Sequence, residues 1–263
     1  MTRYRATVAY DGTAYEGWQR LSPGHPSVQA ALEAAIAQVS RQAVEVIGAG
    51  RTDSGVHAIG QVIAFEVDWK HSTEALLKAI NHALPRDIAL QDLNLQDDFH
   101  PRFDALSRTY GYQVAMVKER QPLTLRTCWQ VPAELDIAAM NAAAALLIGR
   151  HDFATFGSPP DGEGSTVREV FESVWQVQPS LFGRIAQYTI TATAFLRHMV
   201  RRIVWMLVEV GRGRMSLEAF QAAFLARDLS RSGKLAPAQG LTLTEVRYPP
   251  PGTRRPSHYQ ASH

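Results

Sequence analysis

The sequence predicts an α+β fold made of two halves that share one order of elements, β-α-β-β-α-β. Two observations predict it. Stretches in which apolar and polar residues alternate, as they do in strands, open both halves, and stretches with the 3.6-residue period of helices lie between the strands. The chain has 263 residues, of which 46% are hydrophobic and 20% charged, a composition typical of a globular protein with a substantial core.

The first half begins with the alternating stretch RYRATVAY. A helix is expected at 28–39, directly after Ser27, because serine is a common N-cap residue. A second helix carries Leu76, Leu77, Ile80 and Leu84 and ends before Pro85, since proline disfavours helical backbone in the residue before it. The strands of this half are expected at 3–10, 43–48, 61–67 and 88–95.

The second half repeats this order and begins with SRTYGYQVAM. Gly149 is a typical residue to end its first helix. The predicted fold is therefore a pair of ferredoxin-like units, similar to RRM domains, with largely antiparallel sheets. The strands of this half are expected at 107–116, 167–177, 184–193 and 242–248, and its helices at 136–148, 195–210 and 216–226.

The predicted domain boundaries follow from this repeat. An N-terminal half is expected at 1–105 and a C-terminal half at 106–248. The remaining residues, 249–263, are rich in proline and polar side chains and are expected to form a flexible tail. The turn-rich segment 157–166 is expected to be a mobile loop.

Composition excludes several classes of protein. The most apolar helical stretch, 194–211, is interrupted by charged residues, so no membrane span is expected. The N-terminal residues lack the apolar stretch of a secretory signal, and the single cysteine, Cys128, excludes an internal disulfide framework, which fits a reducing cytoplasm. The net charge of +2 is too small to indicate nucleic-acid binding alone, but arginines concentrate at 197–214 among apolar residues.

The stretch GAGRTDSGVHA, at 48–58, is the strongest candidate for a functional loop. Its glycines allow a ligand to approach the backbone closely, and Arg51 lies near enough to Asp53 to favour an ionised carboxylate. Taken alone, the stretch also fits a polar turn with a surface ion pair. His57 and His198 have no obvious ligand partners and are expected to be structural hydrogen-bonding residues. Because the motifs for metal, nucleotide-cofactor and serine-nucleophile sites are absent from the sequence, we expect cofactor-free chemistry on an anionic, aromatic substrate.

Six ordered stretches cover nearly the whole chain and point to one family. They are AYDGTAYEGWQ, SVQAALEAAI, GAGRTDSGVHAIGQV, DFHPRFDALSRTYGY, AFLRHMVRRIV and APAQGLTLTEV. In these stretches the sequence resembles the tRNA pseudouridine synthase A (TruA) family. Six matches in the family's order are far more specific than the RTD triplet alone.

The resemblance implies an activity and a set of partners. It implies isomerisation of uridine to pseudouridine at positions 38, 39 and 40 of the tRNA anticodon stem-loop. In that reaction the N-glycosidic bond breaks and a C–C bond forms from C5 of uracil to the sugar, with no cofactor or metal. It also implies the pseudouridine synthase fold, with the site in the cleft between the halves, and a cytoplasmic homodimer that binds one tRNA across both subunits.

The resemblance also implies roles for individual residues. Asp53 is the expected nucleophile and attacks either the uracil ring or the sugar. Tyr110 is expected to stack on the target base, and Arg201 is expected to pair with Asp53. Arg51 and Leu241 are expected beside the substrate. From the residues alone, Asp53 also fits an Asx-turn, and Tyr110 and Leu241 also fit core packing.

Two other functions stay open at this stage, and three residues depart from the family's pattern. Ser54 stands where alanine is commoner and is expected to be harmless. An RRM-like, non-catalytic RNA-binding protein would share the fold, although the RNP1 signature is absent from the sequence. A hydrolase of a glycosidic bond normally needs two carboxylates, and only Asp53 stands out. Trp205 replaces a small residue and is expected to change helix packing or the subunit contact, and Arg202 replaces a frequent asparagine.

Overall fold

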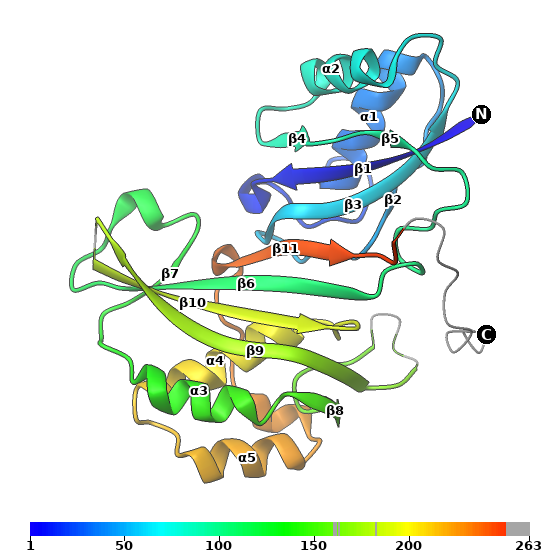
Figure 1. The fold of residues 1–263 in the computed structure, drawn as a ribbon. Helices are drawn as coiled ribbons and strands as arrows, with labels where there is room; N and C mark the ends of the chain where they lie inside the picture. Colours follow the sequence, from blue (N-terminus) through cyan, green and yellow to red (C-terminus); the bar gives the residue numbers. More distant parts are fainter. Residues whose placement is uncertain (160–161, 163, 182, 251–263) are drawn as a thin grey trace.

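A computed structural model describes residues 1–159, 162, 164–181 and 183–250 (Figure 1). Its strands are β1 (Thr2–Tyr10), β2 (Ile47–Gly48), β3 (His57–Val67), β4 (Ile88–Leu90), β5 (Asn94–Leu95), β6 (Ser107–Met116), β7 (Trp129–Val131), β8 (Gly149–Asp152), β9 (Val167–Ser180), β10 (Gly183–Ala192) and β11 (Leu241–Arg247). Its α-helices are α1 (Val28–Ser40), α2 (Thr73–Ala83), α3 (Ile137–Ala145), α4 (Met199–Gly211) and α5 (Leu217–Leu225). Short 3-10 turns lie at Gly12–Ala14, Pro122–Thr124, Leu229–Ser232 and Ala238–Gly240.

The strands form one continuous, mostly antiparallel sheet. The order along it is β4-β1-β3-β11-β6-β10-β9-β8, with β2 paired to β3, β5 to β1 and β7 to β6. Two of these pairs are parallel, β11 with β3 and β7 with β6. The predicted α+β class with a largely antiparallel sheet is therefore confirmed. The last strand, β11, was expected only as part of the second half. It lies in the middle of the sheet, between β3 of the first half and β6 of the second.

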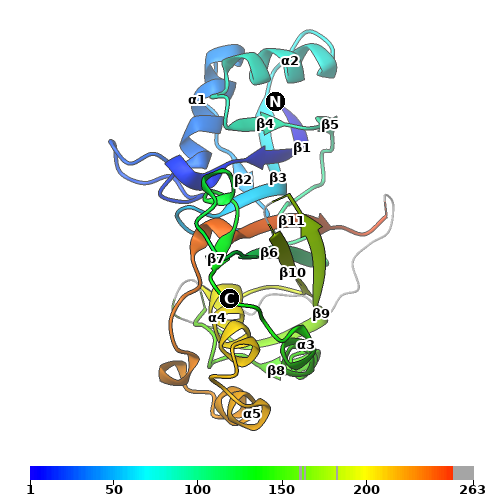
Figure 2. The same ribbon diagram turned by 90° about the vertical axis from the view of Figure 1, so that its left-hand side faces the viewer.

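The helices gather in two groups at the two ends of the sheet. Helices α1 and α2 lie beside β1 and β4, helices α3 and α4 lie beside the strands of the second half, and α5 packs against α3 and α4 (Figure 2). Each group buries an apolar face, for example Leu32 and Ile36 of α1 and Ile203 and Leu207 of α4, all fully buried. Strand β11 lies between the two groups of helices, with β3 and β6 as its neighbours. A site can therefore form where the two groups meet.

Two of the predicted strands are shorter than expected, because side chains take up backbone groups that would otherwise form hydrogen bonds between strands. For 43–48 only β2 forms, since Glu33 Oε1 accepts from Val46 N at 3.1 Å and Gln29 Nε2 donates to Val46 O at 2.9 Å. For 88–95 the strand divides into β4 and β5. There Asp92 Oδ1 accepts from Thr7 N at 2.7 Å, so a carboxylate takes the place of a strand carbonyl.

The predicted helix at 195–210 begins later than expected. Helix α4 starts at Met199, and the residue before it, His198, has a left-handed backbone with φ of 65°. Further along α4, Trp205 stacks on Trp129 of β7, with ring centroids 5.4 Å apart and planes 12° apart, so this residue does take part in packing the helix on the sheet. The predicted tail lies outside the described residues from 251 onwards, as do 160, 161 and 163 of the predicted mobile loop.

Candidate active site

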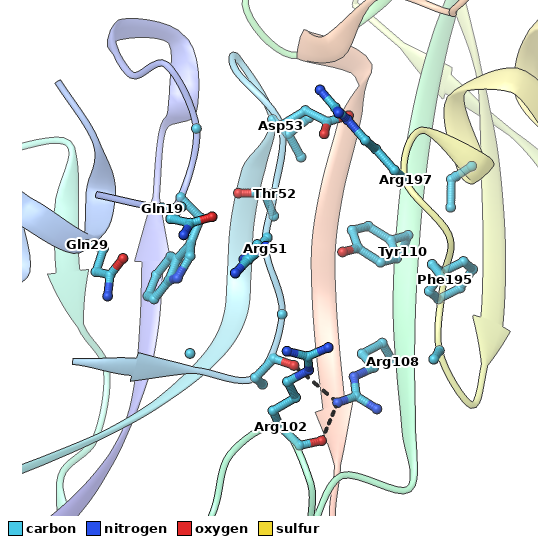
Figure 3. A pocket seen from close by; sticks show the side chains of 18 of the residues that line it. Gln19, Gln29, Arg51, Thr52, Asp53, Arg102, Arg108, Tyr110, Phe195 and Arg197 are labelled. Atoms are coloured by element: carbon cyan, nitrogen blue, oxygen red, sulfur yellow. Dashed lines mark hydrogen bonds between the residues drawn. The ribbon is translucent and has the colours of Figure 1, made fainter. Parts of the chain in front are cut away.

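A pocket of about 1030 Å³ opens where the two predicted halves meet. Its wall includes loops of the first half, the strand β6 of the second half, the segment before α4 and the first residue of β11. The five residues expected at the site all line this pocket: Arg51, Asp53, Tyr110, Arg201 and Leu241. Figure 3 shows Arg51, Asp53 and Tyr110 among the lining side chains.

Asp53 lies on the loop 49–56 between β2 and β3, here called the Asp53 loop. The backbone of Asp53 forms an isolated antiparallel bridge with Gly17, and Trp18 N donates to Thr52 O at 3.0 Å. Gly17 has a φ of 119°, and a Cβ at this position would lie 2.9 Å from Thr52 O. Glycine is therefore needed there twice over, for its backbone conformation and for the close approach of the two loops.

Buried side chains hold the same loop from the sheet side. The hydroxyl of Tyr10 and the hydroxyl of Thr52 are hydrogen-bonded at 2.8 Å, and Gln61 Nε2 donates to Gly50 O at 2.8 Å. Gln61 is fully buried. Because the loop is fixed on both sides, its carboxylate, which is 30% exposed, faces the pocket in a defined position.

Two basic side chains from the second half face the Asp53 carboxylate. Arg201 Nη1 lies 3.3 Å from Asp53 Oδ2, while Arg201 Nε donates to Ala236 O at 2.8 Å. His198 Nε2 lies 3.6 Å from the same carboxylate oxygen. The arginine is thus held at two points, and its guanidinium is directed at the carboxylate from the first turn of α4.

His198 is a site residue that the sequence analysis did not find. The helix expected at 195–210 would have placed it within regular structure, whereas its left-handed backbone turns it toward Asp53. Burial lowers the pKa of His198, and the nearby cations Arg197, Arg201 and Arg202 lower it further, against the opposing effect of Asp53. The imidazole is therefore neutral at neutral pH.

Tyr110 and Leu241 form the apolar part of the pocket wall. The Tyr110 ring comes from β6, is 9% exposed and meets Phe195 edge to face, with centroids 5.0 Å apart. Burial, and then the negative charge of Asp53, raise the pKa of the Tyr110 hydroxyl, so it stays protonated. Leu241, at the start of β11, is 6% exposed, and Arg51 is exposed along the Asp53 loop. A carboxylate, a cation and an aromatic ring thus surround one space.

His57 has the structural role expected of it. Its Nδ1 accepts from Gly12 N at 3.0 Å and lies 3.2 Å from Asp11 Oδ1, while its Nε2 donates to Arg126 O at 2.7 Å. These bonds tie β3 to two loops. Within the described residues there is no group of three or more His, Cys, Asp or Glu that could hold a metal ion, and no helix long and apolar enough to cross a membrane.

A family model and the curated relatives identify one family. A family model described as tRNA pseudouridine synthase matches residues 6–104 and 143–249. The tRNA pseudouridine synthase A of Maricaulis maris (strain MCS10) is 43% identical over 255 residues, which cover 95% of this chain and 100% of the relative. The tRNA pseudouridine synthase A of Myxococcus xanthus is 39% identical over 249 residues, which cover 94% and 92%. A solved Cbf5-Nop10-Gar1 complex aligns with 78% of this chain and 54% of its own chain at 10% identity, with a TM-score of 0.30.

Proposed function

The chain belongs to the tRNA pseudouridine synthase family and is an isomerase that converts uridine to pseudouridine in tRNA, and we propose that Asp53 is its nucleophile. One observation supports this above others. The Asp53 carboxylate faces the pocket, 3.3 Å from the Arg201 guanidinium, and Tyr110 lines the same pocket. We also propose that the target uridines are those at positions 38, 39 and 40 of the anticodon stem-loop, as the resemblance of the sequence implies.

In the proposed reaction, Asp53 attacks either the uracil ring or the sugar carbon. The bond between N1 and the sugar carbon breaks, the uracil turns, and C5 bonds to the same sugar carbon. The bond that Asp53 formed breaks again, by displacement with C5 if it is to the sugar or by elimination if it is to the ring, so the carboxylate is regenerated. The proton on C5 leaves and N1 gains a proton, so the product is an isomer of the substrate. Arg201 supplies a permanent positive charge 3.3 Å from the Asp53 carboxylate, which orients the group that attacks.

The energetics of base extrusion fit the side chains of the pocket. Extruding a base costs a few kcal/mol, and stacking on one aromatic ring returns about 1–3 kcal/mol. Tyr110 alone therefore offsets only part of the cost. Contacts from other arginines of the pocket wall to the RNA phosphates supply the remainder, and Arg51, Arg102 and Arg197 are the candidates.

We further propose that the sheet consists of two ferredoxin-like halves, at 1–105 and 106–248, joined through β11. Within the sheet, β4-β1-β3-β2 and β11-β6-β10-β9 have the same relative order, fourth, first, third and second strand of a β-α-β-β-α-β unit. A cytoplasmic homodimer completes the proposal. Light scattering tests the dimer, since a mass near one chain would contradict it.

The decisive experiment is tritium release from tRNA transcripts labelled with [5-³H]uridine. The C5 tritium is lost when C5 becomes the glycosidic carbon, so the wild type should release it. Asp53→Asn should release none, because an amide does not attack as a carboxylate does. Asp68→Asn, an aspartate that is 70% exposed and lies outside the pocket, is the matched control and should behave as wild type.

Other outcomes of this experiment separate the alternatives. Release by Asp53→Asn at the wild-type rate would remove Asp53 from its proposed role. Tight tRNA binding without release by any form of the protein would favour a non-catalytic RNA-binding protein. Free uracil among the products would favour a glycosidic hydrolase.

A further inference from the structure

The pocket is large and extends well beyond Asp53 (Figure 3). Its volume of about 1030 Å³ is at the upper limit of the 300–1,000 Å³, roughly, that is usual for pockets of small ligands. Figure 3 shows Asp53 and Arg197 at one end and Arg102 and Arg108 at the other, with Arg51 and Tyr110 between them. Because the target uridine belongs at the Asp53 end, the Arg102 end faces another part of the same RNA.

At that second end, an aromatic ring is exposed within the pocket wall. Phe103 lines the pocket although 52% of its surface is exposed. The Arg102 guanidinium lies 5.8 Å from the centroid of its ring, and the His100 ring lies 4.2 Å from it, with planes 33° apart. An exposed aromatic ring beside a cation is the usual arrangement for stacking a base next to a phosphate contact.

Hydrogen bonds make this end of the pocket rigid. His100 Nδ1 accepts from Arg102 N at 3.2 Å and from Phe103 N at 3.1 Å, and Asp104 Oδ2 accepts from His100 N at 2.7 Å. Burial lowers the pKa of His100, which keeps its ring neutral and able to accept these bonds. The exposed ring is therefore held in place by its own loop, residues 98–104, before any ligand binds.

One arginine connects this loop to the Asp53 loop. Arg108 Nη2 donates to Arg102 O at 2.7 Å (Figure 3) and to Ala49 O at 3.1 Å. Its Nη1 donates to Thr193 O at 2.9 Å. The same guanidinium thus spans the two loops and the sheet. The separation between Phe103 and Asp53 is set by this bridge, as two positions on one RNA strand would require.

We propose that Phe103 and Arg102 form a second subsite, which binds a nucleotide that flanks the target uridine. The base of that nucleotide stacks on the Phe103 ring, and its phosphate contacts the Arg102 guanidinium. This inference rests on the proposed function, since it assumes that the substrate is RNA. The role of this subsite is to hold the RNA strand in register while the target base is extruded.

Stacking can be measured directly with 2-aminopurine, whose fluorescence is quenched when the base stacks. Stem-loops carrying 2-aminopurine immediately 5′ or immediately 3′ of the target uridine are bound to Asp53→Asn, which should not turn them over. We expect quenching in one of the two stem-loops. Adding Phe103→Leu to that protein should abolish the quenching, whereas adding Phe103→Trp should preserve it. Equal fluorescence with Phe103 and with Phe103→Leu at both flanks would overturn the subsite.

Kinetics separate this subsite from the catalytic centre. In the otherwise wild-type protein, Phe103→Leu should raise the KM for tRNA about 5- to 100-fold and change kcat less than about twofold, because stacking contributes to binding alone. Phe171→Leu is the matched control, since Phe171 is 50% exposed and lies on β9 outside the pocket. It should leave KM unchanged.

The two proposals can fail separately. Isomerisation with an unchanged KM in Phe103→Leu would overturn the subsite and leave the proposed function intact. If quenching depends on Phe103 but the wild type releases no tritium, the result would support the subsite and contradict the proposed function.

Discussion

The two halves of the molecule place their site residues by different means. The first half presents Asp53 from a loop, and that loop is held by an isolated bridge to Gly17 and by the side chains of Tyr10 and Gln61. The second half presents Tyr110 from a strand paired along its length with β10, and Arg201 from the first turn of a helix. A strand or helix positions a side chain through its whole hydrogen-bond ladder, whereas a loop depends on a few contacts.

The difference determines how each half responds to substitution. The position of the carboxylate should change when a single anchor of its loop is lost. The position of the tyrosine should not change, because neighbouring ladder bonds of β6 remain. Three further experiments test this contrast, beginning with the one for which we expect the largest effect.

Removing the cation that the second half supplies should have the largest effect. Arg201→Gln leaves the Asp53 carboxylate without its guanidinium partner, and we expect turnover to fall about 100- to 1,000-fold, the usual loss for one preorganised electrostatic contact in an active site. Arg201→Lys keeps the charge but cannot hold both Asp53 and the Ala236 carbonyl in a fixed fork, so its loss should be intermediate. Single-turnover tritium release measures both.

Arg214→Gln serves as the control for this experiment, because Arg214 is 67% exposed and contacts Glu209 instead. It should retain wild-type turnover. Equal turnover in Arg201→Gln and Arg214→Gln would show that Asp53 acts without a partner from the second half.

Loosening the loop of the first half should have an intermediate effect. Gly17→Ala forces an alanine into a left-handed conformation, which costs about 1–3 kcal/mol, and brings its Cβ to 2.9 Å from Thr52 O. The two loops must then separate, and a displacement of about 1 Å at the carboxylate can lower kcat/KM up to about 100-fold. Urea unfolding and tritium release measure the two consequences.

Gly24→Ala is the control that separates backbone strain from displacement of the Asp53 carboxylate. Gly24 has a φ of 96°, but a Cβ there has no heavy atom within 4 Å. Gly24→Ala should lose as much stability as Gly17→Ala or less, and it should keep the wild-type activity. If both variants lost the same activity, the close approach of the two loops would not be what positions Asp53.

The smallest effect should come from the titration of His198. Because its pKa is lowered in the folded protein, the unfolded chain binds more protons as the pH falls through about 6.5. The resulting loss of stability is absent above that pH and grows below it. Since His198 is partly exposed, we expect less than about 1 kcal/mol. Urea unfolding of the wild type and of His198→Gln from pH 8 to pH 5 measures it.

His198→Gln should remove this part of the pH dependence. The control is His82→Gln, at an exposed position on α2, which should follow the wild-type curve. Parallel curves for the wild type and His198→Gln below pH 6.5 would contradict the effect.

Local patterns predicted the elements that carry most of the site. Helix α1, with its Ser27 cap, and strand β6 have nearly the predicted bounds, because periodicity and capping act over a few residues. Asp53, Tyr110 and Arg201 were predicted as site residues from the resemblance of short motifs to a family, and motifs of this kind are also local in the sequence. Where side chains compete with the backbone, as Asp92 does beside β1, the pattern failed, since periodicity says nothing of such bonds.

Contacts between distant segments were decided only by the tertiary structure. Asp53 and Arg201 are 148 positions apart, and nothing local in either segment specifies that they meet. The insertion of β11 between β3 and β6 brings the two halves together, and the left-handed backbone of His198 turns that side chain toward the carboxylate. Both features depend on packing across the whole sheet. Short-range preferences set the elements, and the burial of their apolar faces against one another sets the site.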